Sequence, residues 1–490
     1  MTSNHTLRSD AVRAKLEHPV IDGDGHMIEV EPVVVEYMKQ VGGPSLVEDY
    51  VKWCDARWAR WYNATPEERR RRHMQRITYW GIPARNTTDR ATCMLPGLMR
   101  ARLDELGLDL AIVYPTMGNL FIELPNADFR RGVVRAINKM NADLYRPYRD
   151  RLIPAAVIPM HTPAEALAEL DATVRDLGFK SMVLQGGVRR PIAQGDAGGR
   201  FVNSYYVDYL ALDSEYDYDP VWQRCLDLKV APTTHSGSQG LPNRTSPTSF
   251  VFNHLGHFAA HHEGMCKALF LGGVTQRFPA LRFAFLEGGV GWAVSLYNQI
   301  FEHWEKRNID AMMEHLDPSL VDRELLVRLF EKHGDAPHRA GIAQVRDGDG
   351  RFWSQWREDP KELDEFRASG VRSPRDIYER FVPRFFFGCE ADDRMIALAF
   401  DGKLNRLGAR LNAIFSSDIG HWDVIDAAHC LAEAYELVDD GLLGPEDFRD
   451  FTFGNAVRLH AAANPDFFEG TVLAEAARRE IARPPRVAAE

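Results

Sequence analysis

The chain has 490 residues, of which 45% are hydrophobic and 26% are charged, and its formal net charge at pH 7 is -11. This composition predicts a soluble globular protein with a large apolar core. The negative charge is spread along the chain, which argues against a nucleic-acid partner and favours a small-molecule substrate. Residues 1–19 are polar and no apolar run approaches the ~18 residues that span a bilayer, so we expect no membrane partner.

The six cysteines are far apart and include no Cys-x-x-Cys pair. Neither a disulfide framework nor a zinc ribbon is therefore predicted. Because the N-terminus also lacks an apolar signal core, the sequence favours a reducing compartment, and we expect a cytoplasmic protein.

The first predicted strand covers residues 18–24 and leads into Asp24-Gly25-His26. Side chains two apart on a strand point to the same face, so Asp24 and His26 are expected to lie side by side. A carboxylate next to an imidazole suits Zn, Fe or Mn. The triplet alone is a weak signal, because polar residues in a turn look the same.

Seven further short apolar runs follow, separated by segments with apolar residues at helical spacing. Strands that are apolar throughout and alternate with helices form a parallel sheet buried on both faces. Eight of them predict an α/β fold, the (β/α)8 TIM barrel. The predicted strands are residues 18–24, 109–115, 152–159, 180–187, 229–237, 282–289, 384–390 and 412–418.

The remaining stretches predict the domain organisation. We expect an N-terminal tail at 1–18, a barrel at 19–473 and a C-terminal tail at 474–490. Helical cap insertions after strands one and six are expected at about 40–100 and at 308–383, and an active-site loop at 195–220. The aromatic residues of the two caps favour a sizeable, partly apolar substrate.

In such barrels the catalytic residues lie at the carboxyl ends of the strands. Ionisable or polar residues recur at these ends in the sequence. They are Asp24, His26, His161, Gln185, His235, Glu287, Glu390 and Asp418.

The chain resembles the amidohydrolase superfamily. Within it, the resemblance is to the amidohydrolase-related branch typified by aminocarboxymuconate semialdehyde decarboxylase. The resemblance rests on an ordered set of motifs between about residue 20 and 470. They are residues 24–26, 234–237, 272–279, 286–292, 417–422 and 453–456. It implies a metal-dependent (β/α)8 barrel with ligands from strands one, five and eight, and a homodimer.

The resemblance also assigns roles to single residues. Asp24 stands where the family usually has the first His of His-x-His, and His26 matches the second. His235 matches the strand-five ligand and Asp418 the strand-eight carboxylate. Glu287 departs from the pattern, because the decarboxylases commonly carry an acid/base His at its position.

The extra carboxylates favour Fe, Mn or a second metal over a lone Zn. We therefore expect a divalent metal cofactor, Fe, Zn or Mn, as one or two ions. Glu29 and the group His254, His257, His261 and His262 are candidates for completing a two-metal site. His254, His257 and His261 share one helix face, which can equally be a polar surface. His421 is a candidate substrate contact or hydrogen-bond donor near the metal, or a solvated loop residue.

The expected activity is hydrolysis of an amide, ester, lactone or acyl thioester such as an acyl-CoA by a metal-activated water. Asp418 would carry the proton to the leaving group, and Glu287 would bind a second metal or assist the transfer. One alternative is a nonoxidative decarboxylase or hydratase of an aromatic or unsaturated acid. Another, from a different class, is a binding barrel that has lost catalysis and metal.

Overall fold

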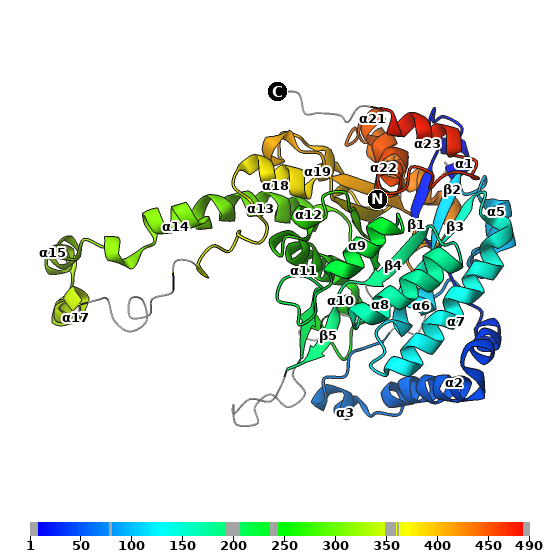
Figure 1. Cartoon of the computed structure of the whole chain (residues 1–490), viewed down its shortest axis with the longest axis horizontal. Helices are drawn as coiled ribbons and strands as arrows, with labels where there is room; N and C mark the ends of the chain where they lie inside the picture. Colours follow the sequence, from blue (N-terminus) through cyan, green and yellow to red (C-terminus); the bar gives the residue numbers. More distant parts are fainter. Residues whose placement is uncertain are drawn as a thin grey trace.

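The computed structural model describes residues 8–77, 81–192, 205–235, 241, 244–347, 359 and 362–483. Figure 1 shows a central sheet surrounded by helices, with a helical arm extending to one side. Ser236 and Gly237 of the strand-five motif, and part of the predicted loop at 195–220, lie outside the described residues. No helix in the described part of the chain is both long and apolar enough to cross a membrane.

Eight strands form one sheet in the order β1-β2-β3-β4-β7-β8-β9-β10, and each pairs in parallel with the next. Strands β10 and β1 also lie in contact, so the sheet is a nearly closed barrel. The predicted (β/α)8 fold is confirmed. The strands are β1 (Ile21–Met27), β2 (Leu110–Pro115), β3 (Leu152–Ile158), β4 (Ser181–Gln185), β7 (Pro232–His235), β8 (Phe283–Phe285), β9 (Phe385–Glu390) and β10 (Asn412–Ser416).

The barrel forms because its strands are apolar enough to be covered on both faces. Every residue of β2 and β3 is buried. Strand β1 is also buried throughout, although it contains Asp22, Asp24 and His26. Burying a polar side chain costs free energy unless it has a hydrogen-bond or ionic partner. Strand β1 is therefore an exception among the apolar strands, and it lies where the functional site is expected.

The helices alternate with the strands and cover the outside of the barrel (Figure 1). Helix α7 places Val133, Val134 and Ile137 in the core, and Asn138 Nδ2 donates to Val157 O of β3 at 2.8 Å. The barrel helices are α6 (Thr116–Phe121), α7 (Ala127–Tyr145), α8 (Pro163–Leu170), α9 (Asp219–Asp227), α10 (Phe250–His254), α11 (His257–Leu271), α12 (Val274–Arg277), α13 (Gly291–Arg307), α18 (Pro374–Phe381), α19 (Ile396–Phe400), α20 (Cys430–Asp439), α21 (Pro445–Arg449), α22 (Asn455–Ala461) and α23 (Ala474–Ile481).

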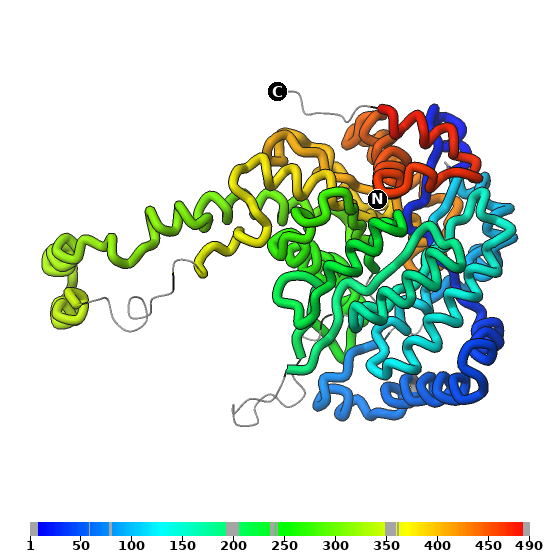
Figure 2. The backbone as a smooth tube through the Cα atoms, viewed as in Figure 1, coloured from blue at the N-terminus to red at the C-terminus, as the bar shows by residue number. Residues whose placement is uncertain are grey.

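The segment between β1 and β2 contains α2 (Glu31–Tyr62), α3 (Pro66–Arg71), α4 (Thr87–Met94) and α5 (Pro96–Arg102). After β4, a short antiparallel hairpin pairs β5 (Val188–Pro191) with β6 (Tyr205–Asp208). The segment after α13 forms the arm, which contains α14 (Ile309–His315), α15 (Arg323–His333), α16 (Ala336–Ala340) and α17 (Ile342–Asp347). The backbone tube in Figure 2 shows this arm reaching away from the barrel.

The N-terminal segment packs on the barrel through α1 (Ser9–Arg13). Val12 is fully buried, and Ser9 Oγ accepts a hydrogen bond from Leu431 N at 3.1 Å. Arg13 Nε pairs with Asp109 Oδ2 at 2.6 Å, directly before β2. The described part of this segment therefore packs against α20 and against the chain just before β2.

Candidate metal centre

Strand β1 presents Asp24 and His26 on the same face, as the alternation of strand side chains requires. Both side chains are fully buried, and His26 Nε2 lies 3.5 Å from Asp24 Oδ1. The same His26 Nε2 lies 3.2 Å from Asp418 Oδ1, which is two residues beyond β10. The structure thus brings together three side chains from the first and last strands of the barrel.

His235, the last residue of β7, reaches the same place from the opposite part of the sheet. Its ring centroid lies 5.1 Å from that of His26. His235 Nε2 is 2.8 Å from Oε2 of Glu287, which follows β8. Four strands therefore contribute side chains to one buried cluster at their carboxyl ends.

The two carboxylate residues that follow their strands have unusual backbone conformations. Glu287 has a φ of 59° and Asp418 a φ of 48°, in the left-handed region that residues other than glycine seldom adopt. Such strained conformations persist only where the surrounding structure enforces them, and they concentrate at functional sites. In this backbone conformation the carboxylates of Glu287 and Asp418 face the imidazoles of His235 and His26.

The possible ligand atoms form two overlapping groups, and within each they lie within 4.8 Å of one another. One group is His26, Glu287, Asp418 and His421, and the other is Asp24, His26 and His235. His26 belongs to both groups. Of the sequence-predicted metal residues, His254 and His257 are in neither group.

The electrostatics of the cluster fit a bound cation. Burial raises the pKa of Asp24, Glu287 and Asp418 well above the usual range, and the charge of Glu287 adds to the effect on Asp418. Both Asp24 oxygens accept no hydrogen bond from the described residues. Burial also lowers the pKa of His26, which keeps its imidazole in the neutral form that binds metal. Because a buried carboxylate without a partner costs free energy, this arrangement favours a bound cation.

His421 connects the cluster to the barrel mouth. Its Nδ1 lies 2.6 Å from Asp418 Oδ1, and its Nε2 lies 3.1 Å from Thr116 Oγ1. The His421 side chain is 17% exposed, whereas Asp418 is almost fully buried. Thr116 was not predicted from the sequence, although its position directly after β2 is the signal that would have included it.

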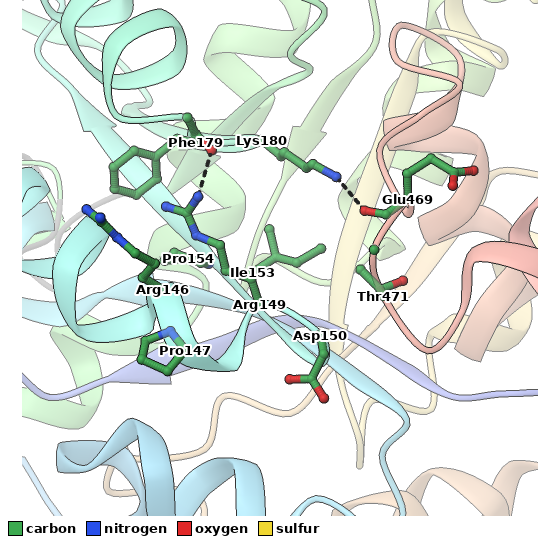
Figure 3. Close-up of a pocket in the computed structure, with 12 residues that line it drawn as sticks. Arg146, Pro147, Arg149, Asp150, Ile153, Pro154, Phe179, Lys180, Glu469 and Thr471 are labelled. Carbon is green, nitrogen blue, oxygen red and sulfur yellow. Dashed lines mark hydrogen bonds between the residues drawn. The ribbon is translucent and has the colours of Figure 1, made fainter.

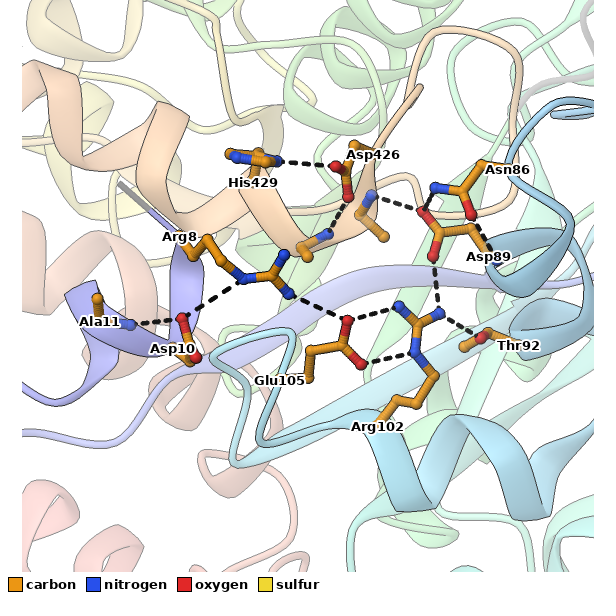
Figure 4. Close-up of polar contacts among 12 residues, drawn as sticks. Arg8, Asp10, Ala11, Asn86, Asp89, Thr92, Arg102, Glu105, Asp426 and His429 are labelled. Carbon is orange, nitrogen blue, oxygen red and sulfur yellow. Dashed lines mark hydrogen bonds and ion pairs between the residues drawn. The ribbon is translucent and has the colours of Figure 1, made fainter. Parts of the chain in front are cut away.

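The loop that carries Asp418 and His421 is fixed by hydrogen bonds on both sides. Asp22 accepts hydrogen bonds from Ser417 N at 2.9 Å and from Ser417 Oγ at 2.6 Å. Further along the loop, Asp89 Oδ2 accepts from Ala427 N at 2.8 Å. Figure 4 shows how Arg102 holds Asp89 in place, with Nη1 2.7 Å from Asp89 Oδ1.

The other predicted ligand candidates have different surroundings. The His254 ring packs at 5.4 Å from Trp422 and 5.5 Å from Phe258. The His257 ring lies 5.1 Å from the ring of His261. Glu29 accepts hydrogen bonds from the main chain at 2.8 and 3.0 Å, at the start of α6. The predicted second group of ligands is therefore not assembled around the two clusters.

A family model described as amidohydrolase matches residues 94–339. No curated protein matches the chain in sequence. Among solved structures, a dihydroxybenzoic acid decarboxylase from Polaromonas sp. JS666, with bound manganese and the inhibitor 2-nitroresorcinol, is similar at a TM-score of 0.50 and 15% identity, covering 92% of this chain and 99% of that one.

Two other solved structures resemble the chain at lower TM-scores. An amidohydrolase from Mycobacterium avium subsp. paratuberculosis gives a TM-score of 0.47 at 14% identity, covering 91% of this chain and 99% of that one. A 5-carboxyvanillate decarboxylase from Novosphingobium aromaticivorans, complexed with manganese, gives 0.46 at 16% identity, covering 91% and 96%. Since the family model matches half of the chain and the fold is the predicted barrel, the protein belongs to the amidohydrolase family.

Proposed function

We propose that the protein is a metal-dependent hydrolase that cleaves an amide, ester, lactone or acyl thioester bond in a sizeable, partly apolar small molecule. The observation that carries this proposal is the buried convergence of Asp24, His26, His235, Glu287 and Asp418 from four strands of the barrel. Membership of the amidohydrolase family supports hydrolysis as the reaction class.

We assign Asp24, His26, His235 and Asp418 as the residues that would hold one divalent ion. A single ion is favoured because His26 Nε2 faces both Asp24 and Asp418, and one imidazole nitrogen binds one metal. Two carboxylates beside two imidazoles suit Mn or Fe at least as well as Zn. Such an ion supplies Lewis-acid chemistry, polarising a carbonyl group and lowering the pKa of a water.

The chain's own residues would then move the proton. Asp418 accepts a proton from the attacking water as the oxygen of that water bonds to the carbonyl carbon. His421 Nδ1, 2.6 Å from Asp418 Oδ1, relays the proton toward the leaving group as the scissile bond breaks. Glu287, whose Oε2 lies 2.8 Å from His235 Nε2, would hold that imidazole in place.

Aromatic side chains support a substrate with a flat, apolar part. Trp422 at the mouth is 39% exposed, and a series of ring contacts leads inward from it through His254 and Phe258 to His235. Neighbouring rings in this series are about 5.5 Å apart, which suits edge-to-face packing. His254 is therefore proposed as part of this wall.

A second candidate is nonoxidative decarboxylation of an aromatic acid. It is favoured by the likeness to the Polaromonas decarboxylase, whose structure contains manganese. In that reaction the bond between the ring and its carboxylate breaks, carbon dioxide leaves, and a proton from Asp418 or Glu287 is added to the ring carbon.

Isotope labelling of the metal-loaded protein distinguishes the candidates. A panel of aryl esters, lactones, amides, acyl-CoA thioesters and hydroxybenzoic acids is incubated in ¹⁸O water and, separately, in deuterium oxide. We expect one ¹⁸O atom in the carboxylate of the product, as hydrolysis requires. Carbon dioxide release with deuterium on the ring would instead establish decarboxylation. No turnover despite a full complement of metal would support a binding barrel that has lost catalysis.

Replacing Thr116 by Val is expected to lower kcat by roughly threefold to tenfold with little change in KM, because it removes one hydrogen bond from His421 Nε2. The pH profile of kcat should shift, since the hydroxyl helps to hold the His421 ring beside Asp418. Thr275→Val is the matched control, because the buried Thr275 hydroxyl has no hydrogen-bond partner in the described chain. An unchanged pH profile in Thr116→Val would remove His421 from the proton relay.

A further inference from the structure

A cavity lies at the opposite end of the barrel from the metal centre, where β3 and β4 begin. Its volume is about 240 Å³. Three basic residues line it, Arg146 and Arg149 before β3 and Lys180 before β4, together with Asp150 and Glu469. Figure 3 shows the Arg149 side chain turned toward the main chain beside Phe179, and Lys180 reaching across to the segment that carries Glu469 and Thr471.

The acidic residues of this cavity are already neutralised by arginines that do not line it. Asp150 Oδ2 lies 2.6 Å from Arg100 Nη2. Glu469 Oε1 accepts a hydrogen bond from Arg478 Nε at 2.9 Å. Among the lining cations, Arg146 pairs at 2.9 Å with Asp143. Neither acid is therefore paired directly with Arg149 or Lys180.

Arg149 and Lys180 have only main-chain acceptors. Arg149 donates to Gly178 O at 3.3 Å and to Leu177 O at 3.4 Å, which are long hydrogen bonds. Lys180 Nζ donates to Phe467 O at 2.7 Å, to Glu469 O at 3.0 Å and to Asp466 O at 3.3 Å. Within the described chain, no carboxylate lies at ion-pair distance from either side chain.

This arrangement leaves the partly buried guanidinium of Arg149 without a carboxylate at ion-pair distance in the described part of the chain. Burial and the charge of Arg146 lower the pKa of Arg149. Burial also lowers the pKa of Lys180, while the negative charges of Glu469 and Asp466 act in the opposite direction. A guanidinium keeps its proton under all ordinary conditions, so Arg149 stays charged. Its planar guanidinium can donate two hydrogen bonds to the oxygens of a phosphate or carboxylate. Its long hydrogen bonds to main-chain carbonyls can be exchanged for shorter ones to such an anion.

We propose that this cavity binds the phosphate or carboxylate group of a small molecule through Arg149, with Lys180 and Arg146 beside it. The site is distinct from the metal centre, because the two lie at opposite ends of the strands. The wall of the cavity includes Glu469 and Thr471, so a bound anion connects the start of β3 and β4 to the C-terminal segment. Binding is therefore expected to stabilise the fold without competing with substrate.

Calorimetric titration and thermal unfolding of the full chain test this proposal, with inorganic phosphate in one arm, acetate in another, and chloride at matched ionic strength as the reference. We expect saturable binding of phosphate or acetate, and the stronger of the two identifies the natural group. Arg149→Gln should weaken binding by roughly tenfold to a hundredfold. Arg131→Gln is the matched control, since Arg131 is exposed and pairs with Asp128.

Two further variants keep the outcome decisive. If Arg149→Gln does not fold, Arg146→Gln replaces it, because Arg146 is 69% exposed and its loss should be tolerated. His26→Asn tests whether the anion binds at the metal centre instead. Binding that is lost in His26→Asn but kept in the Arg149 or Arg146 variant would overturn the proposal, as would an effect that chloride reproduces in full.

Discussion

Asp418→Asn is expected to lower kcat by roughly 10²- to 10⁴-fold, the usual contribution of a positioned acid or base. Asn has nearly the same shape as Asp but is a poor proton acceptor, so the relay to His421, 2.6 Å away, is broken. The backbone at this position has a φ of 48°, a conformation that Asn tolerates better than most residues. The loss should therefore reflect chemistry and not unfolding.

Steady-state kinetics on the substrate found by isotope labelling, with circular dichroism and metal analysis, measure this effect. Asp213→Asn is the matched control, because Asp213 is exposed and has a similar φ of 57°. Its kcat should equal that of the unchanged protein. If Asp418→Asn kept a kcat within about threefold of the unchanged protein, Asp418 could not be the proton carrier.

The barrel could be predicted because its strands carry their signal locally. Most strands are short apolar runs such as residues 110–115, and such runs alternate with helical segments along the chain. The boundaries are less accurate: the sixth strand is predicted to end at Gly289 but β8 ends at Phe285, and the first is predicted to end at Asp24 but β1 continues to Met27. Polar residues normally end a buried strand. In β1, Asp24 and His26 instead lie within the strand, because their side chains belong to the buried cluster at the carboxyl ends of the strands.

Long-range contacts could not be predicted in the same way. The helical spacing of His254 and His257 indicates a shared face but not what that face contacts, and the His254 ring lies against Trp422, far away in sequence. Thr116 reaches His421 across 305 positions of the chain. Glu29 was a candidate ligand, yet its carboxylate accepts hydrogen bonds from the main chain at the start of α6. Each of these contacts depends on how the barrel closes.

His26→Asn is expected to weaken binding of a divalent metal by more than about a hundredfold, because even residues that only support a ligand cost 10- to 100-fold when replaced. His26 is shared by both groups of possible ligand atoms, so its loss affects every arrangement of the ion. Metal analysis after dialysis, and titration with Mn²⁺ and Zn²⁺, measure the change. His254→Asn, the matched control, should retain its metal. Retention in His26→Asn with loss in His254→Asn would move the metal centre to α10.

Metal removal from the unchanged protein should also lower Tm, and increasingly so as the pH rises. Burial and the charge of nearby Asp418 raise the pKa of Glu390 from 4.5 to about 9, and burial raises that of Asp24 in the same direction. The metal-free folded state then binds more protons than the unfolded state, so its stability falls from about pH 4.5 to about pH 9. A cation offsets the buried negative charge and, by binding only the folded state, stabilises it. Thermal unfolding across this pH range, with and without chelator, should give two curves of Tm against pH that separate as the pH rises. The His26→Asn variant should follow the metal-free curve throughout.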